Sequence, residues 1–325
     1  MNHVTSIVIV CAALALAAPA SCGSGKNATA RNANTVGAAT PTAATPAPSQ
    51  TPEAQRPAGG EAMKVLAAGQ YGKVEEPFLV VAREAKVYGE LHALAEGLPE
   101  LGADFFGKHA VVAAFAGTRN SGGYGVEIRR GADRRLVVEE TTPPKGAMTT
   151  MALTQPFKVV AVEVGEEESV EFDLGGARRS STRWRPYVVT SSEFDSGGGF
   201  AGRYEKLTLA GTLRVARLGR LVTVLFDLKG QGGTKERALR GAATGIGGDA
   251  AGVEIPHLDA GTLVDHPRPP LRVSGQFAED AAKLSMTFES LPTNVSDGFG
   301  GTGKLEAKAT GPAAAAKGKQ PAGGE

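Results

Sequence analysis

The sequence has 325 residues, with 35 lysines and arginines against 34 aspartates and glutamates, and its formal net charge is +1. This balance, without a basic run, excludes proteins that hold nucleic acid in a positively charged groove. Once the terminal segments are set aside, about 250 residues remain, which is enough for two ordinary domains.

Residues 1–22 are predicted to be a secretory signal. The run from Val4 to Ala18 is apolar and alanine-rich, but it is too short and ends too abruptly for a membrane-spanning helix. Two motifs end this run. Ala18-Pro19-Ala20 is a cleavage site of the A-x-A type, whereas Pro19-Ala20-Ser21-Cys22 resembles a bacterial lipobox with proline in the usual leucine position. We favour lipidation of Cys22, and the alternative is an ordinary secreted or periplasmic protein.

The two cysteines sharpen this prediction. Cys11 leaves with the signal, so Cys22 has no partner for an intramolecular disulfide, and cysteine-based metal sites and thiol catalysis are excluded. Gly23 follows Cys22 where an aspartate usually retains a lipoprotein in the inner membrane. We therefore expect a lipid-anchored protein of the cell envelope, in the outer membrane if the host has one.

Two segments are predicted to be disordered. Residues 23–62 consist mainly of Ala, Thr, Pro, Ser and Asn, and the tail 311–325 is rich in Ala, Gly and Lys. Neither segment can bury enough apolar surface to offset the entropy lost on ordering. The chain should therefore carry its folded domains between a flexible linker and a flexible tail.

Residues 63–177 are predicted to form a small α+β domain, an antiparallel sheet with one helix. Phe78–Val81 is expected to be a strand, and the apolar spacing from Tyr88 to Ala95 indicates a helix that ends at the break Gly97-Leu98-Pro99. Further strands are expected at Leu136–Glu140 and Thr154–Val162. The acidic cluster that begins at Glu166 is interpreted as a solvated strand edge or loop.

The centre of this domain is predicted to be a β-hairpin. Val111–Phe115 is short and apolar, and Tyr124, Val126 and Ile128 alternate with polar or small residues. Between these runs, Asn120-Ser121-Gly122-Gly123 supplies residues that accept positive φ. The pattern predicts two paired strands with Gly122 and Gly123 in the turn.

These residues carry a family resemblance. Phe115-x-Gly117-x-Arg119-x-x-Gly122-Gly123-Tyr124-x-Val126-x-Ile128, with a Pro-Pro-x-Gly turn at 143–146 and Thr154-x-Pro156-Phe157, resembles the PrcB family over roughly residues 76–165. That family is named for an accessory subunit of a secreted protease complex. The resemblance implies a non-catalytic accessory protein that binds or stabilises a secreted protease or another surface partner.

Arg119, Gly122, Gly123 and Tyr124 are the candidate binding residues. A guanidinium beside the backbone N–H groups of a turn could bind a carboxylate or a peptide terminus. In the alternative interpretation, the Arg119 fork holds nearby carbonyl groups or pairs with Glu127.

Residues 183–310 are predicted to form an all-β domain, an antiparallel sandwich or barrel, so that the whole chain is mainly β with some α. Apolar residues alternate over Leu207–Val215, Leu271–Phe277 and Leu284–Phe288, and Leu221–Leu228 is the most apolar strand. Residues 230–270 are glycine-rich and are expected to be a long connection. A closed barrel with an apolar cavity would make the protein a ligand carrier, which is the second candidate function.

A serine hydrolase is the third and least favoured function. Asp195-Ser196-Gly197-Gly198 resembles the nucleophile turn of trypsin-like proteases, but glycine is missing before Asp195 and His109 lies at a strand start. A triad needs the serine beside an oriented histidine base. We therefore expect no catalytic residue, with Ser196 in an exposed glycine turn.

Metal and cofactor sites are also not expected. His257 and His266 lie nine positions apart with Asp259 and Asp265, but without compact ligand spacing. Gly245-Ile246-Gly247-Gly248 does not open a helix after a strand in a βαβ unit, as a phosphate-binding loop would.

Overall fold

The structure is a computed structural model. It describes residues 63–131, 136–164, 172–174, 183–197, 205–248, 252–264, 270–291 and 300–310. All of them belong to one compact unit, Pro57–Glu325. The predicted signal with Cys22, the linker, the C-terminal tail, and the boundary at 178–182 lie outside the described residues. In the described part of the chain, no helix is long and apolar enough to cross a membrane.

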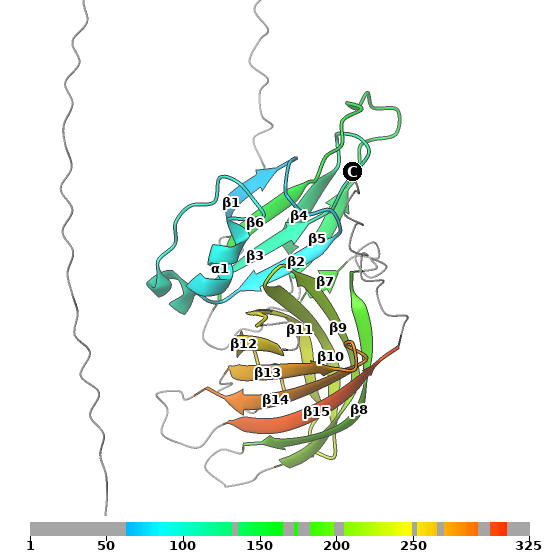
Figure 1. Ribbon diagram of the computed structural model, residues 1–325. Helices are drawn as coiled ribbons and strands as arrows, with labels where there is room; N and C mark the ends of the chain where they lie inside the picture. Colours follow the sequence, from blue (N-terminus) through cyan, green and yellow to red (C-terminus); the bar gives the residue numbers. More distant parts are fainter. Residues whose placement is uncertain are drawn as a thin grey trace, which may run out of the picture. The chain divides into compact units, whose positions relative to one another are not determined.

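A four-stranded antiparallel sheet forms the first layer of the small α+β domain (Figure 1). Its strands follow the order β1-β6-β3-β2, with the bounds β1 Lys64–Gly69, β2 Phe78–Ala82, β3 His109–Phe115 and β6 Phe157–Glu163. Helix α1 (Ala85–Leu91) follows β2 and buries Val87, Tyr88 and Leu91. A short 3-10 helix, Ala103–Gly107, leads into β3. β2 is buried along its whole length and β3 is buried after its first residue, as their continuous apolar sequences predict.

A second, three-stranded sheet holds the rest of this domain. β4 (Gly125–Arg130) pairs antiparallel with β5 (Leu136–Thr141), which pairs in parallel with β7 (Phe172–Leu174). The inward residues Val126, Ile128 and Val138 join the same hydrophobic core as β2 and β3. Apolar and polar residues therefore alternate in β4, as predicted, because only one face of this strand is buried.

The predicted hairpin between residues 111 and 128 is wrong. β3 and β4 belong to different sheets, and residues 116–124 run between them. Instead of pairing the two strands, this segment lies against residues 149–155: the N–H groups of Arg119 and Gly122 donate to the carbonyls of Thr154 and Thr150, at 2.7 and 2.9 Å. Gly123 has the predicted positive φ of 85°, whereas Gly122 does not. The turn signals therefore mark a change of sheet.

The second half of the chain is a closed antiparallel barrel (Figure 1), which decides between the predicted sandwich and barrel. Its strands are β8 Arg185–Ser196, β9 Glu205–Leu218, β10 Leu221–Gln231, β11 Arg237–Ile246, β12 Gly252–Leu258, β13 Leu271–Ala278, β14 Lys283–Ser290 and β15 Gly301–Ala309. Inward residues from all of them pack into one buried cluster, in which Leu213, Val224 and Val273 are fully buried. The predicted fold class, a small α+β domain followed by an all-β domain, is confirmed.

Two barrel strands arise from the segment 230–270, which was expected to be a connection. β11 contains glycine because its backbone comes close to that of β12. A Cβ on Gly245 would collide with the backbone of Glu254 on β12, and Gly241 has a φ of 144°. β8 was also missed, and Ser196 at its end is 1% exposed. The prediction that Ser196 lies in an exposed turn is therefore wrong.

The barrel and the small domain share a hydrophobic core. Trp184, Leu221 and Ile246 from the barrel side belong to the same buried cluster as β2 and β3. The hydroxyl of Thr223 donates to the Leu79 carbonyl at 2.7 Å, and the N–H of Val81 donates to the hydroxyl of Thr244 at 2.9 Å. The two threonines also hydrogen-bond each other at 2.8 Å. Edge strand β2 is thereby covered by the outer face of β10 and β11.

Candidate functional site

Arg119 makes a bidentate ion pair with a glutamate. Its Nε and Nη2 each lie 2.5 Å from a carboxylate oxygen of Glu140, and its Nη1 donates to the Thr118 carbonyl at 2.9 Å. Both side chains of the pair are 20% exposed. The hydrogen bond to Glu140 raises the pKa of Arg119. The partner is therefore Glu140 on β5, while Glu127, the partner that the sequence suggested, lies 2.6 Å from the Nζ of Lys158.

The other three candidates lie in the same segment. The Arg119 guanidinium carbon is 5.9 Å from the ring centroid of Tyr124, whose carbonyl accepts a hydrogen bond from Gln70 at 3.0 Å. Gly122 is buried against Thr150, and a Cβ on Gly123 would lie 2.9 Å from the Cβ of Pro143. The structure thus brings the predicted residues together, and their role in binding stays a prediction.

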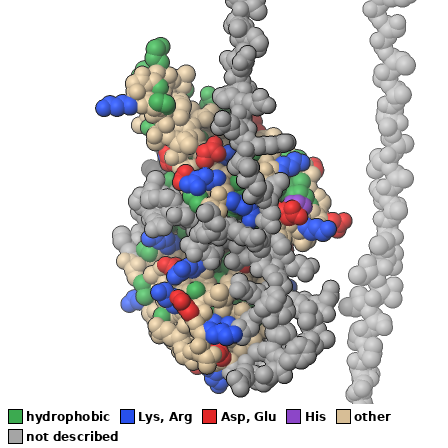
Figure 2. Space-filling model, turned by 180° about the vertical axis from the view of Figure 1, so that it is seen from behind, with side chains coloured by type: hydrophobic (Ala, Val, Ile, Leu, Met, Phe, Trp, Pro, Cys, Tyr) green, Lys and Arg blue, Asp and Glu red, His purple; other side chains and the backbone are tan. Residues whose placement is uncertain are grey.

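The segment that they contact carries exposed apolar side chains. We refer to residues 143–153 as the methionine loop. Met148 and Met151 are fully exposed, and Leu153 is 67% exposed. Figure 1 draws the loop as a projection beyond β5 and β6, and Figure 2 shows hydrophobic side chains on that projection. Tyr71, which is 72% exposed, lies beside the base of the loop because it forms a bridge with Gln155.

Hydrogen bonds hold the base of the methionine loop. Thr154 is buried, exchanges two backbone hydrogen bonds with Arg119, and donates its hydroxyl to the Ser121 carbonyl at 2.9 Å. Farther out, the N–H of Ala147 donates to the Pro144 carbonyl at 3.0 Å. The Arg119–Glu140 ion pair lies at the same base, because Arg119 is the residue that exchanges backbone hydrogen bonds with Thr154.

Sequence reasoning missed this loop as a surface. The signal was present in the spacing Met148-x-x-Met151-x-Leu153 within a stretch of turn-forming and small residues. Such residues on a projection cannot reach the core, so their apolar area remains in water unless a partner covers it.

The residues considered for serine catalysis are not joined. Ser196 pairs with Glu205 of β9 and Gly301 of β15 in the barrel. His109 begins β3, stacks on Phe105 with ring centroids 4.3 Å apart, and has its Nδ1 3.1 Å from the Phe105 carbonyl oxygen. Within the described ranges, no hydrogen bond links the serine to this histidine.

His257 and Asp259 form an ion-pair cluster with an arginine. The Nε2 of His257 lies 3.5 Å from Asp259, and Arg83 reaches the same carboxylate at 2.8 and 2.9 Å. Burial raises the pKa of Asp259, but the hydrogen bond from His257 and the charge of Arg83 outweigh it and hold the pKa at about 2. His266, Asp265 and the acidic cluster that begins at Glu166 lie outside the described residues. Among the residues that are described, no group of three or more His, Cys, Asp or Glu side chains could hold a metal ion.

The glycine motif at 245–248 ends β11. Gly247 donates its N–H to the Arg220 carbonyl at 2.7 Å, and the next described element is strand β12. This placement is a strand-to-strand connection in the barrel, unlike the strand-to-helix turn of a phosphate-binding loop.

The candidate site lies in a stretch that matches a known family. The model of the PrcB C-terminal family matches residues 110–163, which run from β3 through β6. The match includes Arg119, Gly122, Gly123, Tyr124 and the whole methionine loop. A search of curated proteins found no match to the chain. The resemblance to the PrcB family that the glycine–arginine motif predicted is confirmed for this stretch.

Proposed function

We propose that this protein is a non-catalytic accessory protein of the cell envelope that binds a secreted protease or another surface protein through its PrcB-like domain. The family match supports the accessory role, because the PrcB family is named for a protease-complex subunit. One structural observation carries the proposal further: the matched stretch contains a loop whose two methionines are fully exposed.

The chemistry of the methionine loop fits a protein partner with an apolar groove. Methionine has three rotatable bonds and a polarizable thioether, so it adapts to irregular apolar surfaces and is common at binding surfaces. Burying one methionine side chain contributes about 1.5–3 kcal/mol. The loop base is fixed by Thr154 and by the Arg119–Glu140 pair, so the apolar tip is presented without unfolding the sheet.

The binding role can be tested with a double variant, Met148→Ser with Met151→Ser. Proteins that co-purify with the wild-type chain from its native envelope would be identified, and the partner would then be purified and titrated. We expect the double variant to bind that partner at least about tenfold more weakly, because each tenfold step corresponds to about 1.4 kcal/mol. The melting temperature should be unchanged, since neither side chain contacts the core.

Val188→Ser is the matched control, because Val188 is an exposed apolar residue on barrel strand β8. It should bind the partner like the wild type. Equal affinity of the double variant and the wild type would refute the methionine loop as the contact surface. A wild-type chain that associates with no secreted or surface protein would refute the accessory role itself.

Arg119→Ala separates the two interpretations of that residue. It removes the fork that holds Glu140, so we expect a lower melting temperature together with weaker partner binding. If Arg119 instead contacts the partner directly, binding falls while the melting temperature stays constant.

The anchor is a separate part of the proposal. If Cys22 carries lipid, Cys22→Ala should move the protein from the membrane fraction to the soluble fraction, because each buried methylene of an acyl chain contributes about 0.8 kcal/mol. Membrane retention of the variant would contradict lipidation.

The alternative functions receive less support. The barrel interior is filled by side chains of one buried cluster, so the described residues offer no basis for a carrier with an apolar ligand in the barrel. The hydrolase alternative lacks a base beside Ser196 in the described part of the chain.

A further inference from the structure

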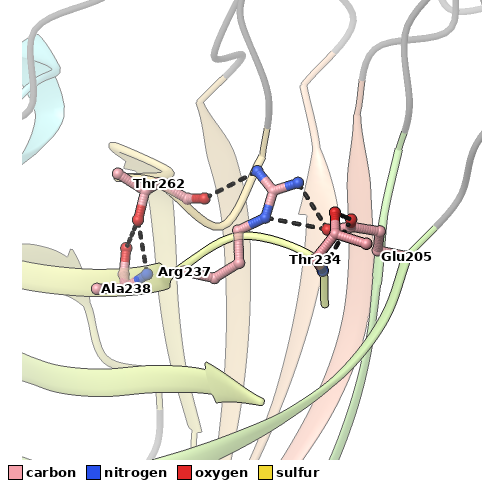
Figure 3. Close-up of polar contacts among 5 residues, drawn as sticks. All are labelled: Glu205, Thr234, Arg237, Ala238 and Thr262. Atoms are coloured by element: carbon pink, nitrogen blue, oxygen red, sulfur yellow. Dashed lines mark hydrogen bonds and ion pairs between the residues drawn. The ribbon is translucent and has the colours of Figure 1, made fainter. Parts of the chain in front are cut away.

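Inward-facing arginines lie at both ends of the barrel. At the end where β9 and β11 begin, the Arg237 side chain is only 4% exposed and is neutralised by Glu205 at 2.7 Å (Figure 3). Arg237 also donates to the Thr262 carbonyl at 3.3 Å, and Thr234 hydrogen-bonds the same glutamate. Hydrogen bonds from Thr234 and Arg237 lower the pKa of Glu205 to about 2. This cation therefore has a built-in counter-anion.

The opposite end of the barrel carries Arg185 and Arg217. Arg185 is on the same face of β8 as Tyr187, and Arg217 is on the same face of β9 as Val215; both neighbours belong to the barrel's interior cluster. Because side chains alternate along a strand, the two arginines also face inward, at the end where β8 begins and β9 finishes.

Arg217 extends across this opening. Its guanidinium carbon lies 4.3 Å from the ring centroid of Phe277 on β13. In the closed barrel β13 and β9 are opposite each other, separated by β10, β11 and β12 on one side and by β14, β15 and β8 on the other. Arg185 lies 5.9 Å from the ring of Tyr187, which is itself 6.4 Å from Phe277. The two cations and two aromatic rings therefore lie together at one opening of the barrel.

Unlike Arg237, these two arginines have no carboxylate partner among the described residues. Arg185 donates from Nη1 to the backbone carbonyl of Asp280 at 3.0 Å. The Nε of Arg185 and the Nη2 of Arg217 are buried and have no hydrogen-bond partner among the residues that the structure describes. In the nearest turn, the Glu279 carboxylate pairs with Lys283. Asp280 binds Arg185 through its backbone carbonyl, and no ion pair joins its carboxylate to either arginine in the described part of the chain.

This arrangement is costly unless an anion completes it. A buried donor on a charged group that lacks a partner destabilises the protein, and two nearby cations repel each other. Burial also lowers the pKa of Arg217. We propose that Arg185 and Arg217 form a binding site for an oxyanion, a carboxylate or phosphate group, at this end of the barrel.

The rim of the site is held in position for such a ligand. The Tyr187 hydroxyl donates to the Ala281 carbonyl at 2.7 Å, and Arg185 holds the neighbouring carbonyl of Asp280. Glu279, Asp280 and Ala281 all have positive φ, a conformation that these contacts maintain. The faces of the aromatic rings are already used by the arginines, so the ligand is recognised by its charged group and an apolar body would remain outside.

The test is thermal unfolding of the full mature chain with added sodium phosphate or sodium acetate, at an ionic strength kept constant with sodium chloride. Binding to the folded state raises the melting temperature, by about 5–10 °C when the anion reaches 100 times its Kd. We expect a saturable rise for the wild type and its loss in the double variant Arg185→Gln with Arg217→Gln. Arg272→Gln, which removes the charge of an exposed arginine on β13, is the control and should keep the rise.

The outcomes decide the proposal. Equal rises in the double variant and the wild type, or no rise in the wild type with either salt, would overturn it. If the double variant fails to fold, Arg185→Gln alone is used with calorimetric titration, and it should weaken anion binding at least about tenfold relative to Arg272→Gln. Adding a short peptide that ends in glutamate then distinguishes the source: tighter binding than acetate indicates a peptide carboxylate, and tighter binding of phosphate indicates a phosphate group.

Discussion

The barrel and the small domain satisfy their strand edges in different ways. Every barrel strand has a neighbour on both sides, because β8 closes the ring between β15 and β9. The four-stranded sheet of the small domain instead ends at β2, where hydroxyls of barrel residues Thr223 and Thr244 bond two backbone groups. The barrel is therefore complete by itself, whereas the small domain relies on the barrel to cover its edge.

The cores differ in the same way. The barrel interior forms a hydrophobic cluster of its own. The core of the small domain includes Trp184, Ala216, Leu221, Ala242 and Ile246, which come from the barrel side. The indole N–H of Trp184 donates to the Pro77 carbonyl at 3.2 Å and its ring stacks on Phe78, with centroids 6.0 Å apart. The outer face of the barrel thus functions as part of the interior of its neighbour.

Separating the two halves should give the largest effect. We expect residues 183–310 alone to unfold cooperatively on heating, because the closed barrel keeps its own cluster and loses no strand pairing. Residues 63–177 alone should aggregate or stay unfolded, since they expose the apolar face and edge of β2. Circular dichroism melts and size-exclusion chromatography would measure both fragments. A monomeric, cooperatively folded 63–177 fragment would show that the small domain does not depend on the barrel.

A smaller perturbation removes only the hydroxyls at the junction. Thr223→Val with Thr244→Val keeps the shape of the side chains but leaves the Leu79 carbonyl and the Val81 N–H without partners. We expect a loss of about 2–6 kcal/mol in the free energy of unfolding, at about 1–3 kcal/mol for each buried unsatisfied group. Thr212→Val, on an exposed position of β9, is the control and should change stability little. Denaturant titration distinguishes them, and a double variant as stable as the control would show that the hydroxyls do not hold the edge.

A third change acts within the small domain and leaves the barrel untouched. Gly123→Val places a β-branched residue at a φ of 85° and pushes its Cβ toward Pro143. We expect a loss of about 1–2 kcal/mol or more. Gly146 has nearly the same φ, 84°, but a Cβ added there would have no atom within 4 Å. Gly146→Val should therefore lower the free energy of unfolding only by the amount that comes from backbone strain. Equal losses would show that contact with Pro143 adds nothing.

The smallest effect is expected in acid. The folded-state pKa of Glu205 in the barrel is about 2, below its ordinary value of 4.5, because Thr234 and Arg237 bind the carboxylate. Its contribution to stability is therefore present above about pH 4.5 and is lost as the pH falls toward 2. Asp259, between Arg83 and His257, should behave in the same way from its ordinary 3.8 down to about 2.

Two variants assign this acid sensitivity to the barrel or to the junction. Glu205→Gln should make stability fall less steeply over that range of pH if the carboxylate at the barrel end is responsible. Asp259→Asn should do so if the carboxylate that binds Arg83 of the small domain is responsible. Melting temperatures between pH 2 and 6 provide the measurement. If both variants show the same dependence of melting temperature on pH as the wild type, other carboxylates control acid unfolding.

The sequence alone determined the elements whose signal is local. The alternation in Leu207–Val215 and Leu284–Phe288 predicted β9 and β14, because a strand with one buried face places apolar residues at every second position. The glycine–arginine motif was likewise sufficient for the PrcB resemblance. Its residues are recognised by their spacing in the sequence, without knowledge of the residues that they contact. The division into a small α+β part and an all-β part followed from these patterns.

Tertiary structure decided everything that depends on which segments meet. The sequence could not show that β3 and β4 enter different sheets, that Arg119 pairs with Glu140, or that the glycine-rich segment supplies β11 and β12. A turn signal says that the chain changes direction but not which strand it joins, and a glycine that permits close backbone contact looks the same as one that breaks a strand. The arginines at one end of the barrel also depend on tertiary structure. Arg185 and Arg217 lie near each other only because closure of the barrel brings strands that are far apart in sequence to one opening.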